Sequence, residues 1–389
     1  MKLKISELGK VITGNTPSKK IKEFWDKDDV GFVKPDIISD EHIVKIKSED
    51  CNEFISNAAI SKARIVPKNS IFVTCIGNIG KIGVATENLA FNQQINAIIP
   101  NENVNLDYLC YTIFANKTRL QDIANAPIVP LLNKSQFSEF ELEFDMDINT
   151  QTRIVHELNT VSNIILKYKQ ELLLLDELVR ARFVEMFGDP IQNSKGYPIR
   201  QFSDYIISLT SGSRGWAKYC VNDGKEWFIT IKNVKDCNII TDNIQPINAP
   251  SNAEAKRTKV EEGDLLISIT ADLGRTGVVT KEVAEHGAYI NQHLSCIRID
   301  REILNPLYVA YYMESSAGKR QFIQKNQSAV KAGLNFNSIN SLKLLVPPME
   351  EQNKFIRFVK QIDKSRSRIQ KSLEASQELF DSLMQEYFG

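Results

Sequence analysis

The most regular pattern of apolar positions begins near the middle of the chain. Apolar side chains recur there at alternating spacings of four and three residues: Ile154, Leu158, Val161, Ile165, Tyr168, Leu172, Leu175 and Val179. A heptad pattern of this kind is typical of a helix that packs along another helix. It predicts a long helix in residues 148–188, capped by Asn149 or Thr150 and ended by Gly188.

The same pattern occurs again 201 residues later in the chain. Its positions are Phe355, Val359, Ile362, Arg366, Ile369, Leu373, Ser376 and Phe380. Arg366 and Ser376 interrupt the apolar seam, as polar residues that set helix register do. Pro347-Pro348 prevents an earlier start, so a second long helix is expected in residues 349–389. The predicted helix-pairing residues are the apolar members of both seams other than Tyr168.

Two helices in matching phase can pair in two ways. They can pack antiparallel within one chain, or they can pair with the helices of a second chain and form a dimer. The antiparallel pair within one chain is favoured, because a single chain carries both helices in the same phase.

Matches outside the helices indicate that the whole chain is a duplication. Four short matches keep the same order in both halves, with offsets from 194 to 202: residues 70–84 with 264–278, Asn92-Gln93 with Asn291-Gln292, 106–111 with 306–311, and Leu132-Asn133 with Leu334-Asn335. A period of about 200 residues is the mark of a repeated domain and not of a solenoid.

Each globular repeat is predicted to be α+β. Short apolar runs such as residues 70–76 and 82–86, bounded by Gly, Asn and Pro, are typical of strands and hairpins. Residues 105–124 and 304–325 look helical. The predicted order is a globular domain, a helix, a globular domain and a helix, in residues 1–147, 148–188, 189–348 and 349–389.

Charge and composition limit the classes of function. The 389 residues carry 48 basic and 48 acidic side chains, with 17 basic and 20 acidic in residues 1–147 and 19 and 16 in residues 189–348. Nucleic acid would therefore be bound by local patches or with charge from a partner. The six cysteines are scattered, and the sequence has no signal-peptide pattern and no apolar run of membrane-spanning length, which favours a cytoplasmic protein.

The sequence contains no recognisable catalytic motif. It has no phosphate-binding loop of the P-loop type, and the spacing of Gly77, Gly80 and Gly83 fits a tight hairpin better than a dinucleotide fingerprint. Val346-Pro347-Pro348-Met349 lacks both ends of the amino-methyltransferase tetrapeptide, and the four histidines have no zinc-ligand spacing. We therefore expect neither a catalytic site nor a bound metal in this chain.

Two globular domains, each followed by a long heptad helix, resemble the specificity subunit of type I restriction–modification enzymes. The segment Pro347-Pro348-Met349-Glu350-Glu351-Gln352 at the start of the second helix supports the resemblance, which covers the whole chain. The start of the first helix departs from it, because residues 145–151 keep only the glutamine, Gln151.

The resemblance implies a non-catalytic DNA-recognition subunit. Each globular unit would be a target recognition domain that reads one half of a bipartite, asymmetric site in double-stranded DNA. The antiparallel helices would fix the spacing and, with adjoining surfaces, recruit two modification subunits that bind S-adenosylmethionine and methylate adenine. Restriction and translocase subunits would join that complex, while this chain would hold no cofactor and contact no membrane. The alternative is a coiled-coil scaffold whose globular domains bind proteins.

Comparison of the two repeats separates the candidate DNA contacts into groups. Lys81 and Arg275 place a cation at the same hairpin tip, so they are predicted phosphate contacts. Asn92-Gln93 and Asn291-Gln292 could read adenine, but their recurrence favours a structural hydrogen-bond role.

Residues that read bases should differ between the repeats and lie in polar loops, although a polar loop is often only solvated. The candidates are Thr16, Ser18, Lys19, Lys20, Lys34, Asp36, Lys134 and Ser135 in the first repeat, and Ser213, Arg214, Trp216, Lys232, Asn233, Lys331 and Asn337 in the second. For Trp216, packing in the core or at its rim is favoured over stacking on DNA.

Overall fold

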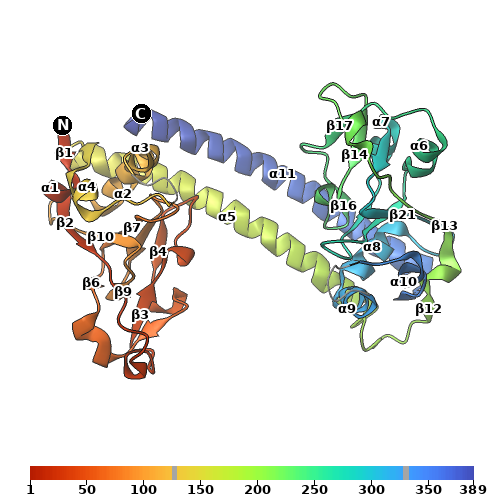
Figure 1. Ribbon diagram of the computed structural model, residues 1–389, viewed down its shortest axis with the longest axis horizontal. Helices are drawn as coiled ribbons and strands as arrows, with labels where there is room; N and C mark the ends of the chain where they lie inside the picture. Colours follow the sequence, from red (N-terminus) through yellow and green to blue (C-terminus); the bar gives the residue numbers. More distant parts are fainter. Residues whose placement is uncertain (125–128, 327–332) are drawn as a thin grey trace. The chain divides into compact units, whose positions relative to one another are not determined.

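The computed structural model describes residues 1–124, 129–326 and 333–389, which leaves the candidate Lys331 outside the described residues. The chain forms two compact units. Unit 1 comprises residues 1–170 and 370–389, and unit 2 comprises residues 171–369. Each unit therefore contains one globular domain together with part of both long helices, and both chain termini belong to unit 1 (Figure 1).

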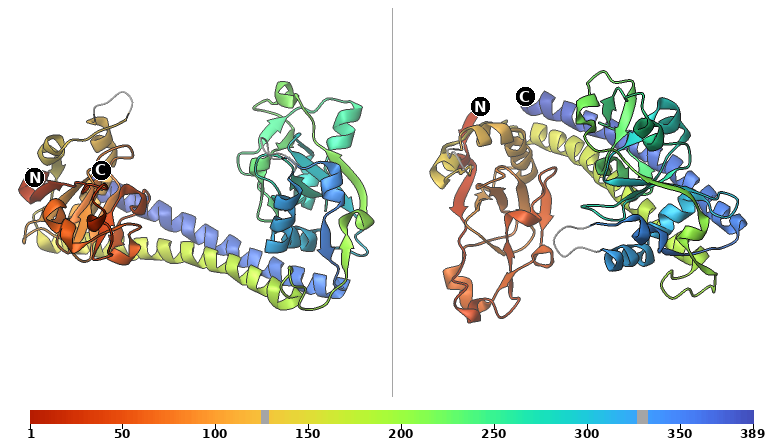
Figure 2. Two further views of the ribbon diagram at one scale, coloured as in Figure 1. Left: turned by 60° about the horizontal axis from the view of Figure 1, so that its bottom comes forward. Right: turned by 45° about the vertical axis from the view of Figure 1, so that its right-hand side comes forward.

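Both predicted long helices are present. They are α5 (Ile148–Phe187) and α11 (Met349–Phe388), and each has 40 residues. Within each unit, the two helical segments lie side by side and run antiparallel (Figure 2). Every predicted helix-pairing residue is buried or half-buried. The apolar seam therefore does what its heptad spacing predicts.

The seams also join the helices to the globular domains. In unit 1, Ile154 and Leu158 of α5 share a hydrophobic core with Phe380 and Phe388 of α11 and with the helix α2 (Leu106–Ala115). In unit 2, Val179 and Phe187 of α5 share a core with Phe355 and Val359 of α11 and with the helix α8 (Pro306–Glu314). Each globular domain thus packs on its own helix and on the end of the other helix.

The start of α5 is capped differently from the prediction. The side chain of Asp147, and not of Asn149 or Thr150, accepts hydrogen bonds from the backbone N–H groups of Asn149 (3.3 Å) and Thr150 (3.1 Å). Because α5 begins at Ile148, Asp147 holds the N-cap position, whereas Asn149 and Thr150 lie inside the first turn of the helix. A hydrogen bond from the Thr150 hydroxyl (2.6 Å), together with these two backbone hydrogen bonds, lowers the pKa of Asp147 below its ordinary value.

Gln151 and Gln352 occupy equivalent buried positions in the first turns of α5 and α11. Gln151 Nε2 donates to the backbone oxygen of Asp145 at 2.5 Å. Gln352 Nε2 donates to the backbone oxygens of Ile303 and Pro347, and its Oε1 accepts from the N–H of Asn305 at 2.8 Å. The one residue shared by the two helix starts therefore fastens each helix to its globular domain.

Unit 1 contains two main sheets. The first has the strand order β2-β10-β7-β8-β4 and the second β5-β3-β9-β6, while β1 pairs with β11. The strands are β1 (Lys2–Lys4), β2 (Gly9–Thr13), β3 (Val30–Val33), β4 (Val44–Ile46), β5 (Phe54–Ile55), β6 (Ile65–Val66), β7 (Ile71–Thr74), β8 (Ile82–Ala85), β9 (Leu89–Phe91), β10 (Ile95–Pro100) and β11 (Glu141–Glu143). The remaining helices are α1 (Ile5–Leu8), α3 (Lys117–Asp122) and α4 (Lys134–Glu139).

Unit 2 repeats this topology. Its sheet β13-β21-β18-β19 corresponds to β2-β10-β7-β8, the parallel pair β14·β20 corresponds to β3·β9, and β12·β22 corresponds to β1·β11. The strands are β12 (Ile199–Gln201), β13 (Ile206–Ser211), β14 (Glu226–Ile229), β15 (Val234–Lys235), β16 (Asn238–Ile239), β17 (Gln245–Ile247), β18 (Leu265–Ser268), β19 (Thr276–Val278), β20 (Ala288–Ile290), β21 (Leu294–Ile299) and β22 (Lys343–Leu345). The predicted duplication and α+β class are confirmed.

The helices of unit 2 differ slightly from the prediction. They are α6 (Ala253–Thr258), α7 (Lys281–His286), α9 (Ser316–Lys325) and α10 (Phe336–Asn340), besides α8. Each helix predicted in residues 105–124 and 304–325 is in fact two helices, separated at Asn116 and at Ser315. Ser315 has extended backbone and its hydroxyl accepts from Gly318 N–H, so a new helix begins there.

Candidate nucleic-acid interface

The strands of unit 1 converge on the turn Asn92–Gln94, which joins β9 to β10. Asn92 N–H donates to the backbone oxygen of Val33 at the end of β3, at 3.1 Å. Cys75 N–H, after β7, donates to the oxygen of Gln94 at 2.8 Å, and Asn15 N–H, after β2, donates to the oxygen of Phe91 at 3.1 Å. The loops that follow β2, β3 and β7 therefore meet around one turn.

Unit 2 has the same arrangement around the turn Asn291–His293. Asn291 N–H donates to Ile229 at the end of β14 (3.0 Å), Ile269 N–H to His293 (2.9 Å), and Ser213 N–H to Ile290 (3.1 Å). We call the surface made by each turn and the loops bonded to it the turn surface of that unit.

Glycine is needed where the loop after β2 or β13 crosses the turn. A Cβ atom on Gly14 would lie 2.0 Å from the backbone oxygen of Asn92, and one on Gly212 would lie 2.0 Å from that of Asn291. Only a residue without a side chain allows this close approach of two backbones. The following residues, which include seven of the seventeen candidate DNA contacts, are thereby held beside the turn.

Asn92 and Asn291 have the structural role that their recurrence predicts. Asn92 Oδ1 accepts from the N–H of Gln94, and Asn291 Oδ1 accepts from the N–H of His293, both at 3.1 Å. These bonds close the turn locally. The neighbouring Gln93 is exposed and Gln292 is half-buried. From the sequence we predicted one structural role for both residues of each pair. In the structure the Asn side chain has that role, whereas the Gln side chain remains at least partly exposed.

The segment that leads into α4 completes the turn surface of unit 1. Leu132 N–H donates to the oxygen of Cys75 at 2.9 Å, which places the start of α4 next to the β7–β8 hairpin. Lys134 and Ser135 are exposed in the first turn of α4. In unit 2, Leu334 N–H donates to Ile269 at 2.8 Å, and Asn337 is exposed in α10. Candidates far apart in sequence are thus brought together at one end of each sheet.

A network around Glu53 joins the lysine candidates of unit 1. Lys19 Nζ lies 3.0 Å from Glu53 Oε2, and Lys34 Nζ pairs with Glu53 Oε1. Partial burial raises the pKa of Glu53, but the two lysines outweigh it and hold the pKa below its ordinary value. Asp36 accepts a hydrogen bond from Asn52 at 3.2 Å. The positive charge of Lys19 and Lys34 is therefore partly neutralised by the single carboxylate of Glu53.

Other candidates of unit 1 are more open. Ser18 and Lys20 are exposed, and Lys20 has no ion pair among the described residues. Thr16 Oγ1 lies 2.6 Å from Gln93 Oε1, so the side chain of Thr16 orients the exposed Gln93. Glu53, Asn52 and Gln93 were not singled out individually by sequence reasoning, because only the fold brings them next to the candidate loops.

The candidates of unit 2 divide by burial. Arg214 and Lys232 are exposed and have no ion pair among the described residues. Ser213, Trp216 and Asn233 are only 3%, 3% and 6% exposed. Trp216 stacks on Phe228 at 5.8 Å between ring centroids, so it packs in the core as favoured. Asn233 Oδ1 accepts from Thr230 N–H at 2.9 Å. We accordingly assign these three buried side chains structural roles, and base reading in unit 2 is expected from the exposed residues.

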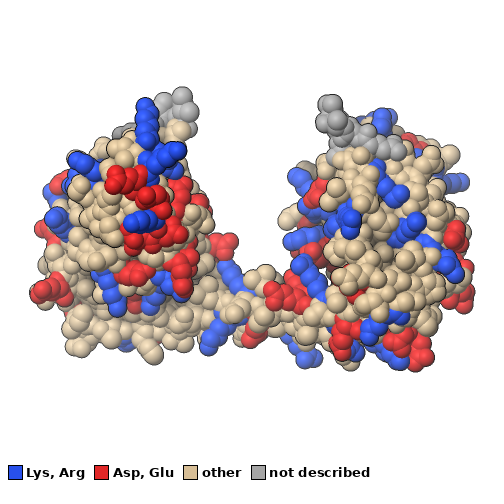
Figure 3. Space-filling view, turned by 90° about the horizontal axis from the view of Figure 1, so that it is seen from below, with Lys and Arg blue, Asp and Glu red and all other residues tan. Residues whose placement is uncertain are grey.

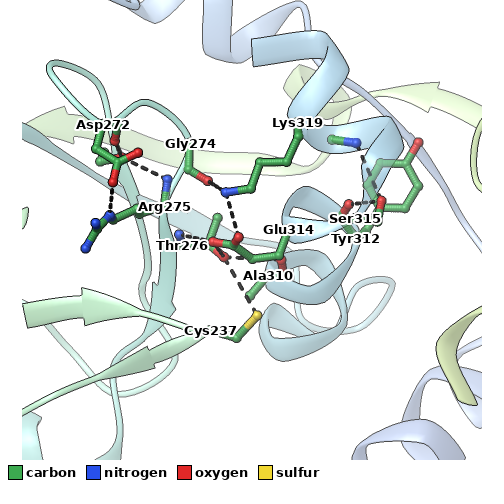
Figure 4. Close-up of polar contacts among 12 residues, drawn as sticks. Cys237, Asp272, Gly274, Arg275, Thr276, Ala310, Tyr312, Glu314, Ser315 and Lys319 are labelled. Carbon is green, nitrogen blue, oxygen red and sulfur yellow. Dashed lines mark hydrogen bonds and ion pairs between the residues drawn. The ribbon is translucent and has the colours of Figure 1, made fainter. Parts of the chain in front are cut away.

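The hairpin tips carry the predicted cations in unequal surroundings. In unit 2, Arg275 Nε donates to Asp272 at 2.5 Å, and the neighbouring Lys319 bonds to the oxygen of Gly274 (2.9 Å) and to Glu314 (2.6 Å), as Figure 4 shows. In unit 1, position 78 is Asn and Lys81 has no ion pair within the described part of the chain. Lys81 is therefore the freer of the two predicted phosphate contacts.

Each unit presents both signs of charge. On the faces seen in Figure 3, Lys and Arg side chains are interspersed with Asp and Glu and form no single basic field. Within the described ranges, no group of three or more His, Cys, Asp or Glu is placed to hold a metal ion. No helix in residues 1–124, 129–326 or 333–389 is long and apolar enough to span a membrane.

Comparison with known proteins places the chain in a family. The sequence pattern described as the type I restriction modification DNA specificity domain matches residues 1–174 and 222–377. The specificity subunit of the type I restriction enzyme MjaIX from Methanocaldococcus jannaschii is 23% identical over 402 aligned residues, covering 98% of this chain and 90% of that protein.

Solved structures share the fold. The specificity subunit of a type I restriction–modification system from M. genitalium has a TM-score of 0.61 at 13% identity, over 100% of this chain and 96% of the other. A chain from work on complex assembly and conformational transition of the type I system has a TM-score of 0.52 at 13% identity, over 100% and 97%. The repeated domains, the paired helices and these matches together show that this chain belongs to the family of type I restriction modification DNA specificity domains.

Proposed function

We propose that each globular domain of this specificity subunit reads one half of a bipartite, asymmetric DNA site through its turn surface. One observation carries the proposal. The two turn surfaces have the same backbone frame but different exposed side chains, such as Ser135 in unit 1 and Asn337 at the equivalent position in unit 2. A shared frame with different donors and acceptors is what two different half-sites require.

The paired helices and adjoining surfaces are proposed to fix the half-site spacing and to recruit two modification subunits. Those partners would bind S-adenosylmethionine and methylate adenine, and restriction and translocase subunits would join them in the cytoplasm. The similarity to a chain from work on type I complex assembly supports this part of the proposal. As a member of the specificity family, this chain supplies recognition and not catalysis.

The mixed charge of the two units supports the proposal that the partner subunits contribute to DNA binding. Because Lys and Arg are interspersed with Asp and Glu on the faces seen in Figure 3, we expect the isolated chain to bind DNA weakly, and the assembled complex to bind it tightly.

Methylation mapping tests the proposal. The chain is co-expressed with its cognate modification subunit in a host without other adenine methylation, and methyladenine is located by sequencing. We expect a single motif of two specified halves separated by a fixed gap. Methylation that is absent, or that occurs equally without this chain, would overturn the proposal in favour of a protein-binding scaffold.

A further inference from the structure

The two long helices are alike enough for each to pair with its own copy in a second chain. They have the same length and the same seam phase. Their last aromatic contacts are repeated as well, since the Phe187 ring lies 4.9 Å from Tyr308 in unit 2 and the Phe388 ring lies 5.4 Å from Tyr108 in unit 1. Apolar packing alone therefore discriminates poorly between α5–α11 pairing and α5–α5 pairing.

One polar match between α5 and α11 lies in unit 2. Arg366 on α11 donates to Asp176 on α5 at 2.5 Å and to Asp363 on its own helix at 2.6 Å. The Arg366 side chain is 31% exposed, so this bridge is partly removed from water. Partial burial raises the pKa of Asp363 despite the neighbouring arginine.

The equivalent place in unit 1 has no such bridge. Position 366 corresponds to Ile165 and position 176 corresponds to Gln377 at the offset of 201. Ile165 and Gln377 line one cavity of about 450 Å³ in unit 1. The ion pair is thus present at one of the two equivalent positions.

A second polar match lies in unit 1. The Tyr387 hydroxyl on α11 donates to Glu157 on α5 at 2.5 Å, and Arg153 donates to the same hydroxyl at 3.4 Å. In unit 2 the equivalents of Tyr387 and Glu157 are Met186 and Phe358, which both pack against the hydrophobic core. The polar pair of unit 1 therefore corresponds to an apolar pair at the equivalent positions of unit 2.

Self-pairing of the helices would break both matches. By the same register, α5 against α5 places Asp176 opposite Ile165 and Glu157 opposite Met186, twice in each dimer. Pairing of α11 with α11 places Arg366 opposite Gln377 and Tyr387 opposite Phe358. Carboxylates and a guanidinium would then lose their partners in a half-buried seam, which opposes self-pairing.

We propose that the Asp176–Arg366 and Glu157–Tyr387 matches determine which helices pair, and so determine which two recognition domains are joined. They favour α5 with α11 over pairing with the same helix of a second copy. The consequence for DNA rests on the proposed function. Self-paired α5 helices would join two first domains, which would read a symmetric site in place of the asymmetric one.

The pairing is tested with the full chain, without DNA. Two differently tagged copies are co-expressed, and the mixed species is quantified by tandem purification and native mass spectrometry. The double variant Asp176→Leu and Glu157→Leu makes the α5 seam compatible with itself. We expect the fraction of mixed species to rise at least about tenfold over the unsubstituted chain.

A matched control removes two carboxylates that point away from the seam. Glu171→Leu with Glu177→Leu changes the same charge on exposed positions of the same helix. We expect no rise in mixed species. An equal rise in the control, or no rise in a folded seam variant, would overturn the proposal.

Charge exchange keeps the test valid if the leucine variant does not fold. Asp176→Arg alone and Arg366→Asp alone should each raise the mixed species, and the two together should restore the unsubstituted level. Failure of the combined variant to restore it would contradict the pairing role.

Methylation mapping then separates this proposal from the proposed function. The leucine variant should gain methylation at inverted repeats of one half-site. Gain of mixed species without any chain-dependent methylation in the unsubstituted protein would remove the DNA function but leave the pairing role standing. If the leucine variant showed no rise in mixed species while the unsubstituted chain directed bipartite methylation, the pairing role would be contradicted and the DNA function would stand.

Discussion

Units 1 and 2 share a backbone frame but differ in how their surface cations are neutralised. In unit 1, Lys19 and Lys34 both form ion pairs with Glu53. In unit 2, Arg214 and Lys232 have no ion pair among the described residues. Duplication has kept the buried hydrogen bonds that build the turn and has varied the exposed groups around it, as expected of two readers with different targets.

The largest expected difference between the units concerns the ends of the long helices. Phe187 is fully buried against Tyr308 and Phe355, whereas Phe388 is only half-buried against Tyr108. Phe187→Ala should destabilise the protein by about 3–5 kcal/mol and Phe388→Ala by about half as much. Urea unfolding followed by circular dichroism measures both. Equal losses would show that the two helix ends are packed alike.

The buried glutamines should give the next largest difference. Gln352 makes three hydrogen bonds to backbone groups, while Gln151 makes one and its Oε1 has no partner among the described residues. Gln352→Ala should cost about 2–3 kcal/mol and Gln151→Ala about 1 kcal/mol, because fewer buried groups lose their partners. Urea unfolding measures both losses of stability. A larger loss for Gln151→Ala than for Gln352→Ala would contradict this prediction.

Removal of one cation from each turn surface should separate the contributions of the two units to DNA recognition. Arg214→Ala should lower the methylation rate of sites through one half only, by about tenfold. Lys20→Ala should act on the other half only. Libraries that randomise one half-site at a time measure both effects. If both variants weakened the same half, the assignment of one half to each unit would be wrong.

The smallest effect expected is a pH dependence confined to unit 1. The pKa of Glu53 is lower in the folded protein than its ordinary value, so its ion pairs stabilise above the unfolded pKa and this stability is lost as the pH falls through the folded pKa. Glu53→Gln should therefore flatten the loss of stability between about pH 5 and pH 3. Thermal unfolding across that range measures it, and an unchanged slope would contradict the role of the Glu53 network.

Much of the fold could be predicted from the sequence, because it is carried by periodic apolar positions. Residue spacing along the sequence is enough to identify the seams of α5 and α11, the duplication and the hairpins. The cap at Asp147 was missed, because three neighbouring polar residues are all acceptable caps and only backbone geometry selects one.

The candidate site was predicted less completely than the fold. The sequence identified the loops, but it could not show that Ser213, Trp216 and Asn233 are buried or that Glu53 neutralises two lysines across a distance of up to 34 residues. Such facts depend on which strands pair, and pairing is a long-range property. The recurrence of Asn92 and Asn291 in both repeats marks them as structural, whereas the residues around them vary between the repeats.

Exchange of one recognition domain tests whether each unit reads its own half of the DNA site. Residues 1–147 are replaced by the corresponding domain of another family member, both helices are kept, and methyladenine is mapped with the modification subunit present. We predict that one half of the motif changes, while the other half and the length of the gap stay the same. A motif that does not change, or one in which both halves change together, would contradict the claim that each unit reads its own half-site.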